Sequence, residues 1–166
     1  MEPIEIIGED QLPEPPNGMY PARVDERGRL KLPVCMQTFI NALPDDEKKL
    51  YATSLDRRIG LLYIKSAWRA NKKMLNRERN TVGAAGRMRF SAEHLGSDTE
   101  MDGQGRVLLS PELRRELGIE NQPVKVCAVS PYRIEVYSEA EFERMNRESA
   151  EHAEEDVVLM APRGLL

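Results

Sequence analysis

Apolar residues recur at every second position over two short stretches of the chain, and each stretch follows the same turn motif. The motif is Asp-x-x-Gly-Arg, and its two copies are Asp25–Arg29 and Asp102–Arg106. Apolar residues at every second position follow each Arg, a spacing that predicts a β-strand. The pattern therefore predicts two β-hairpins whose turns carry the motif.

The glycine of each motif fixes the shape of its turn. Gly28 and Gly105 each lie three residues after the Asp, which suits a type I turn followed by a residue at positive φ. Glycine adopts positive φ without a Cβ clash, so the turn needs it at this place. Arg29 and Arg106 then leave the turns at a fixed angle, and we expect the hairpins to present them as paired basic tips.

The spacing of the other apolar residues predicts a short helix after each hairpin, then two strands and a longer helix. The elements predicted in the first half are strands at 18–24 and 30–32, a helix at 34–43, strands at 49–54 and 60–64, and a basic helix at 67–79 capped by Ser66. Those predicted in the second half are a strand at 107–109, a helix at 112–117 between Ser110-Pro111 and Gly118, strands at 124–129 and 132–137, and an acidic helix capped by Ser138 that ends near 155. Residues 87–94 are expected to form a short helix or a turn.

The two halves have the marks of an internal repeat. A Tyr follows the Asp 38 residues later in the first copy and 35 residues later in the second, and an aromatic residue comes five positions after each Tyr, early in a helix. Two unrelated turn motifs would not share these positions. The predicted divisions are an irregular N-terminal arm at 1–17, a first repeat with its helix at 18–82, a connector at 83–95, a second repeat with its helix at 96–156, and a C-terminal tail at 157–166.

Composition describes a soluble globular protein of 166 residues, with 40% hydrophobic and 31% charged residues. The N-terminus is acidic and lacks the basic-then-apolar plan of a signal peptide, so we expect a cytoplasmic protein with no membrane partner. Cys35 and Cys127 both lie in apolar surroundings, which favours buried, reduced thiols over a disulfide.

Charge is distributed unevenly although the net charge is only −4. Residues 56–90 carry a balance of +8, and residues 135–156 carry a balance of −7. Local field rather than net charge steers an anionic partner, so the basic run could attract one. The alternative is that both runs are solvated helix faces, and we favour that interpretation for the acidic run.

Residues that could support catalysis or metal binding are scarce. His94 and His152 are the only histidines, and neither stands at metal-ligand spacing from a Cys or a carboxylate. The sequence contains no phosphate-binding Gly-rich loop and no Gly-x-Ser-x-Gly nucleophile motif. We therefore expect no enzyme activity, no cofactor, no metal and no small-molecule substrate.

The doubled motif resembles the MraZ family of bacterial transcriptional regulators, whose two halves are of the SpoVT–AbrB type. The similarity runs from about Gly18 to Glu148 and includes the basic stretch at 87–90 between the two copies. It implies an α+β fold: an intertwined β-barrel of the AbrB type in which two tandem repeats, each followed by a helix, exchange hairpins. It also implies assembly into a ring-like homo-oligomer.

The same resemblance assigns roles to the motif residues. Arg29 and Arg106 match the DNA-contacting arginines of the family, and Asp25 and Asp102 match its paired aspartates. We expect each Asp to support the turn and its Arg, although an Asp that caps its own turn beside a purely structural Arg would look the same in sequence. Residues that flank the first turn and could contact phosphates are Arg23, Arg27 and Lys31. Ser110 departs from the first copy, which has Pro33 at that position.

The function implied is sequence-specific binding of double-stranded DNA at repeated promoter elements. By resemblance, the protein would act chiefly as a repressor of its own division and cell-wall gene cluster, in association with the nucleoid. The alternative is an antitoxin-like DNA binder whose tail binds a toxin. The doubled unit argues against the alternative, because such antitoxins generally carry one unit.

Overall fold

The computed structural model describes residues 4–166, so the first three residues of the expected N-terminal arm lie outside the described part. The first half contains the strands β1 (Met19–Val24), β2 (Arg29–Lys31), β3 (Lys49–Thr53) and β4 (Gly60–Tyr63), and the helices α1 (Val34–Asn41), α2 (Lys65–Glu78) and α3 (Gly83–Leu95). The second half contains β5 (Ser97–Glu100), β6 (Arg106–Leu108), β7 (Pro123–Ser130) and β8 (Arg133–Ser138), with α4 (Pro111–Leu117) and α5 (Glu139–Met160). Short 3-10 turns lie at Glu9–Gln11, Asp45–Lys48 and Ala161–Arg163.

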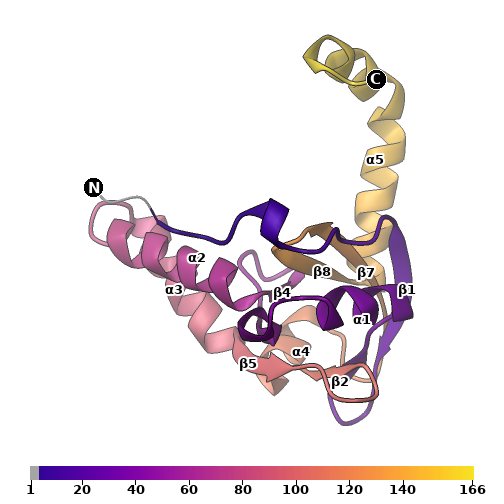
Figure 1. Cartoon of the computed structure of the whole chain (residues 1–166). Coiled ribbons are helices and arrows are strands. Elements are labelled where there is room, and N and C mark those ends of the chain that lie inside the picture. The colour runs from indigo at the N-terminus through magenta and orange to yellow at the C-terminus, as the bar shows by residue number, and fades with distance from the viewer. Residues whose placement is uncertain (1–3) are drawn as a thin grey trace.

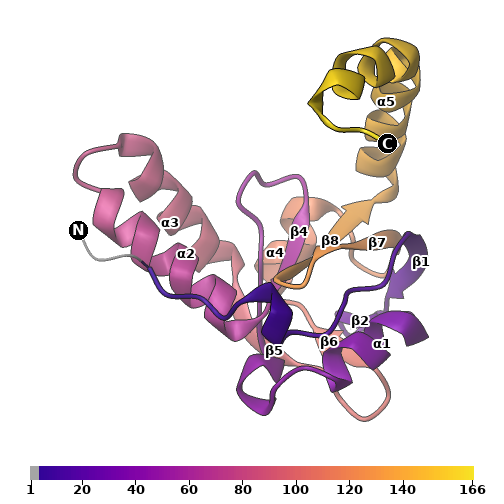
Figure 2. The same cartoon turned by 45° about the horizontal axis from the view of Figure 1, so that its top comes forward.

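All eight strands belong to one antiparallel sheet in the order β5-β3-β4-β8-β7-β1-β2-β6. The two outermost strands, β5 and β6, follow each other in the chain. The Asp102 backbone N–H donates to the Arg106 carbonyl at 2.9 Å, which joins these strands through the second turn. The sheet therefore curls into a nearly closed barrel, with β2, β6 and α1 gathered at one end of the molecule (Figures 1 and 2).

The two halves exchange strands. β1 pairs with β7 of the other half, β3 pairs with β5, and β2 pairs with β6. An approximate twofold axis relates the halves and passes between Leu30 and Val107, which face each other in the β2–β6 pair. This arrangement confirms the predicted α+β barrel with swapped hairpins.

The barrel interior is filled by aliphatic side chains that alternate with outward-facing polar ones. Val24, Leu30, Val107 and Val126 are all fully buried. Each such side chain contributes about 1.5–3 kcal/mol when removed from water. The core therefore fixes the register of the strands, because a slip by one residue would turn these positions outward.

The helices that follow the two halves differ in position. α2 packs against α3 and against the start of β3, whereas α5 projects from the barrel on the other side (Figures 1 and 2). α5 has no buried residue. The expectation that the acidic helix ends near 155 is wrong, because the helix reaches Met160. The apolar residues at its end, Val157–Met160, are exposed.

The sequence did not predict the strand β5, and it predicted a shorter helix than the α3 of the structure. The strand β5 reads Ser-Asp-Thr-Glu, and it forms through backbone pairing with β3 rather than through an apolar face. The connector forms the 13-residue helix α3, longer than the short helix or turn expected at 87–94. Ala85, Ala92 and Leu95 of α3 are buried, and the two small alanines let this helix approach its neighbours closely.

The predicted helix caps had different outcomes. Ser110 and Ser138 accept hydrogen bonds from Leu113 and Glu141, as predicted. Ser66 is not a cap, because α2 begins two residues earlier than predicted, at Lys65, with Ile64 at the N-cap position. The carboxylate of Glu47 instead accepts from the Ser66 backbone N–H at 2.9 Å, so a distant acid satisfies this helix start.

Cys35 and Cys127 are free thiols that are half-buried rather than fully buried. Across residues 4–166, no helix is both long and apolar enough to cross a membrane.

Candidate nucleic-acid interface

Two structurally equivalent tips carry the motif residues. We define the first tip as residues 23–32 and the second as residues 100–109. In the first, one carboxylate oxygen of Asp25 accepts from the backbone N–H groups of Arg27 and Arg29, both at 2.9 Å. The other oxygen accepts from the Arg29 Nε at 3.0 Å. Asp25 therefore shapes the turn and holds the Arg29 guanidinium at the same time.

In the second tip, Asp102 organises only the backbone. Its carboxylate accepts from the N–H groups of Gln104 and Arg106, at 2.8 and 3.0 Å. The Arg106 side chain thus leaves the same kind of turn without the carboxylate clamp that Arg29 has. The two arginines are placed alike but are held differently.

These hydrogen bonds also keep both carboxylates charged. The Arg29 N–H, followed by that of Arg27, lowers the pKa of Asp25, and the Arg29 guanidinium lowers it further. The N–H groups of Arg106 and Gln104 lower the pKa of Asp102, with smaller contributions from the charges of Arg106 and Arg29. An ionised carboxylate is the better acceptor for these N–H groups, so both turns keep these hydrogen bonds at neutral pH.

The glycines of the two turns are in contact with the opposite half of the molecule. Gly28 and Gly105 have φ of +80° and +78°, as the turn type requires. A Cβ on Gly28 would fall on the guanidinium of Arg114 in α4, and one on Gly105 would fall on the side-chain amide of Gln37 in α1. Each helix therefore closes over the turn of the other half, and the turns cannot shift independently.

Gln37 and Arg114 were not singled out from the sequence, although both lie in the repeat register. Each donates to the carbonyl that ends its neighbouring strand: Gln37 Nε2 to Leu32 at 2.7 Å, and Arg114 Nη1 to Leu109 at 3.0 Å. Their separation equals that of Asp25 and Asp102, so the register was the available signal.

A two-stranded ribbon, β2 with β6, forms the surface between the tips. Its pairs are Arg29 with Leu108, Leu30 with Val107, and Lys31 with Arg106. Leu30 and Val107 point into the core, so the other four side chains alternate onto the outer face. We refer to these four outward residues and their strands as the ribbon. It presents three cations on a support that the barrel core holds in place.

The remaining predicted basic residues lie around the first tip. Arg27 is exposed at the turn itself. Lys31 Nζ donates to the Gln104 carbonyl and so joins the two tips. The Arg23 guanidinium donates to the carbonyl and the side-chain oxygen of Asn121, at 2.9 and 3.1 Å, which fixes it beside the α4–β7 loop.

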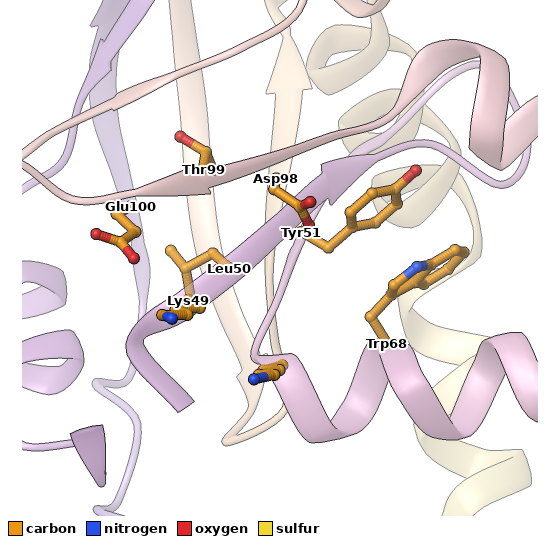
Figure 3. Close-up of a pocket in the computed structure, with 8 residues that line it drawn as sticks. Lys49, Leu50, Tyr51, Trp68, Asp98, Thr99 and Glu100 are labelled. Carbon is orange, nitrogen blue, oxygen red and sulfur yellow. The ribbon is translucent and has the colours of Figure 1, made fainter. Parts of the chain in front are cut away.

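Another concave region lies away from the ribbon, where α2 meets β3 and β5 (Figure 3). Its volume is about 560 Å³, and Tyr51 and Trp68 stack in it with ring centroids 4.6 Å apart. Lys49 and Lys65 line it together with the acids Asp98 and Glu100. This balance of charge does not favour an anion, so the ribbon remains the candidate nucleic-acid surface. Among residues 4–166, no cluster of His, Cys, Asp or Glu is arranged to hold a metal ion.

Known proteins resemble this chain over most of its length. A relative from Acidobacterium capsulatum, named "Transcriptional regulator MraZ", is 32% identical over 89% of this chain and 98% of its own. The chain belongs to the MraZ family. MraZ regulators from Koribacter versatilis and Herpetosiphon aurantiacus are 29% and 31% identical, over 89% and 73% of this chain and 98% and 79% of their own.

The family model described as "MraZ protein, putative antitoxin-like" matches residues 96–160. This MraZ match begins just before β5 and ends with the last residue of α5. It therefore includes the second tip and the whole projecting helix.

Proposed function

We propose that this protein is a transcriptional regulator that binds double-stranded DNA through the ribbon. The observation that carries the proposal is the outward display of Arg29, Lys31 and Arg106 on two paired strands whose other face is buried. A two-stranded ribbon fits the major groove of B-DNA, which is about 12 Å wide. The names of the MraZ relatives support the assignment to transcription.

The clamp on Arg29 supports specific recognition of a base. An arginine fork pairs in a bidentate way with guanine O6 and N7 when its plane is fixed. The Asp25 carboxylate occupies the Nε edge of Arg29 and leaves the two terminal nitrogens for a base. Arg106 supplies the second contact, related to the first by the twofold axis.

The flanking cations have a different role in the proposal. Arg27 and Lys31 contact phosphates on either side of the groove, and Arg23 steadies the first tip through Asn121 while adding to the local positive field. Such contacts set affinity and orientation but not sequence choice. Asp25, Gly28, Asp102 and Gly105 shape the turns.

The regulatory setting follows from the family resemblance. We propose that the protein binds repeated elements near the promoter of its own division and cell-wall gene cluster, chiefly as a repressor at the nucleoid. In this scheme residues 18–82 and 96–156 are the two DNA-binding repeats, residues 83–95 join them, and the arm at 1–17 and tail at 157–166 lie outside the repeats.

Self-association would let several ribbons bind successive repeats at once. The basic hairpin of helices α2–α3 and the acidic helix α5 lie on opposite sides of the barrel (Figures 1 and 2). Four consecutive apolar residues near the end of α5, Val157–Met160, are exposed. We propose that α5 of one copy packs on α2–α3 of the next, through these charges and this apolar segment, in a ring-like homo-oligomer.

The DNA-binding proposal is tested by fluorescence anisotropy at fixed salt, with a duplex from upstream of the protein's own gene. The double variant Arg29→Ala, Arg106→Ala is expected to lose binding, since each bidentate contact contributes about 1–3 kcal/mol. Arg87→Ala, an exposed arginine of α3, is the matched control and is expected to bind nearly as the parent does. Unchanged affinity of the double variant would contradict the proposal.

Self-association is tested separately by light scattering at micromolar concentration and low salt. The parent is expected to show a multimeric mass, and Val158→Glu is expected to reduce it. Val129→Glu, at an exposed valine of the barrel, is the control. A monomeric parent would contradict the assembly while leaving the DNA site untouched.

A further inference from the structure

Leu108 is an apolar side chain displayed on a basic surface. It stands on the outer face of the ribbon with 56% of its surface exposed. Its neighbours Val107 and Leu109 are 0% and 2% exposed, so they anchor β6 to the core. Leu108 adds nothing to that core, so its apolar side chain is free to contact a partner on the outside.

The register places Leu108 directly beside Arg29. Backbone bonds run from Leu32 to Gly105 and from Leu109 to Gly28. The pairs between them alternate, so Arg29 and Leu108 form a non-hydrogen-bonded pair, in which side chains approach most closely. Cβ atoms in such pairs lie about 4.5–5.5 Å apart. A base contacted by Arg29 therefore has Leu108 next to it.

The twofold axis shows that this arrangement is not forced by the fold. The counterpart of Leu108 in the first half is Lys31, which stands beside Arg106. The same backbone position thus holds a cation in one half and a branched apolar side chain in the other. The outer face has one half suited to guanine and phosphate, and one half suited to guanine and an apolar group.

We infer that Leu108 contacts the 5-methyl group of a thymine adjacent to the base contacted by Arg29. This inference rests on the proposed DNA-binding function. The thymine methyl is the one apolar group that base edges present in the major groove. A leucine in van der Waals contact with it is the chemical match, and Leu108 is the outward apolar residue of the ribbon.

Deoxyuridine provides a direct test because it differs from thymidine only by that methyl group. Thymines of a footprinted operator are replaced one at a time, and affinities are measured by anisotropy for the parent and for Leu108→Ala. When deoxyuridine replaces one particular thymine of each repeat, the affinity of the parent is expected to fall about fourfold, which corresponds to the burial of one methyl group. Leu108→Ala is expected to bind the thymine operator more weakly and to lose nothing further on deoxyuridine.

Lys31→Ala is the matched control at the pseudo-equivalent position. It is expected to weaken binding to both duplexes by the same factor, because a phosphate contact does not sense the methyl group. Equal deoxyuridine effects in the parent and in Leu108→Ala would overturn the inference. So would a changed oligomer mass for Leu108→Ala in light scattering, since the side chain would then cover a contact between copies.

Failure of the DNA-binding function has a different signature. In that case the parent does not select the operator over a scrambled duplex, and the double variant of Arg29 and Arg106 binds as the parent does. A parent that selects the operator but tolerates deoxyuridine at every position refutes the role of Leu108 alone.

Discussion

The two tips share a backbone and differ in almost every side chain that points to solvent. Both keep the Asp, the Gly and the Arg of the motif. At the corresponding positions around them, the first tip has Arg23, Arg27 and Lys31, and the second has Glu100, Gln104 and Leu108. The first tip has a net charge of +2 and the second a net charge of −1.

This difference separates what the hairpin needs from what the surface does. The turn requires a carboxylate for its N–H groups and a glycine where the other half closes over it. The other outward positions do not shape the turns, so they are free to differ. The barrel is symmetric in backbone and asymmetric in charge, and a DNA duplex bound across the ribbon would have a defined direction.

The largest effect is expected from a substitution of the turn glycine, which both tips share. Gly28→Val forces a β-branched residue into positive φ and displaces Arg114, whose hydrogen bond to Leu109 is lost. The free energy of unfolding is expected to fall by at least about 2 kcal/mol, measured by urea denaturation. Gly103→Ala is the control, because its Cβ meets no atom within 4 Å. Equal stability of the two variants would contradict the interlocked turns.

The next prediction compares the two carboxylates. Both have a lowered pKa in the folded protein, so the stability they supply is present above the unfolded value of about 3.9 and is lost as pH falls through the folded value. Asp25→Asn and Asp102→Asn are each expected to make the free energy of unfolding depend less on pH between the folded and unfolded pKa values of the carboxylate. Only Asp25→Asn is expected to weaken operator binding strongly, because it alone releases an arginine side chain. Equal binding losses would show that the clamp on Arg29 is unimportant.

A smaller effect is expected when the tips are exchanged at one position. Arg27→Gln gives the first tip the residue of the second, and Gln104→Arg does the reverse. The slope of log K against log salt is negative. If this position contacts phosphate, the slope is expected to become shallower by about 1 in the first variant and steeper by about 1 in the second. Anisotropy titrations at several salt concentrations provide the slopes. Two unchanged slopes would place this position off the DNA backbone.

The smallest effect is expected away from both tips. Arg77→Ala removes one cation from the basic helix α2, where the Arg77 Nε lies 3.6 Å from the Oε1 of Glu78. If this helix acts on DNA only through its electrostatic field, the variant is expected to bind more weakly at low salt, and this difference is expected to vanish near 0.15 M, where the screening length is about 8 Å. A loss that persists at physiological salt would place α2 in direct contact with DNA.

The sequence predicted what local chemistry determines. The two Asp-x-x-Gly-Arg turns and the caps at Ser110 and Ser138 follow from residues within a few positions of one another, and all four are present. The sequence missed what distant contacts determine. β5 has a polar sequence and exists because β3 pairs with it, and α2 begins where the Glu47 carboxylate meets Ser66.

The candidate site was predictable to a similar degree. The arginines could be located from the repeat, because the motif itself contains them. Gln37 and Arg114 could not be linked to the glycines, since each helix covers the turn of the opposite half. The outward direction of Leu108 depends on the pairing of β2 with β6, which no local pattern specifies.

The exchange of strands between the halves also dictates when this protein can fold. Met19 of β1 pairs with Cys127 of β7, 108 residues later in the chain. At a synthesis rate of about 5–20 residues per second, β1 waits roughly 5–20 s on the ribosome before its partner exists. During that interval the nascent first half carries unpaired strand edges and an unfilled apolar interior, the features that chaperones bind and that lead to aggregation. A message truncated before β8 therefore yields no smaller working regulator, because neither half contains a complete sheet.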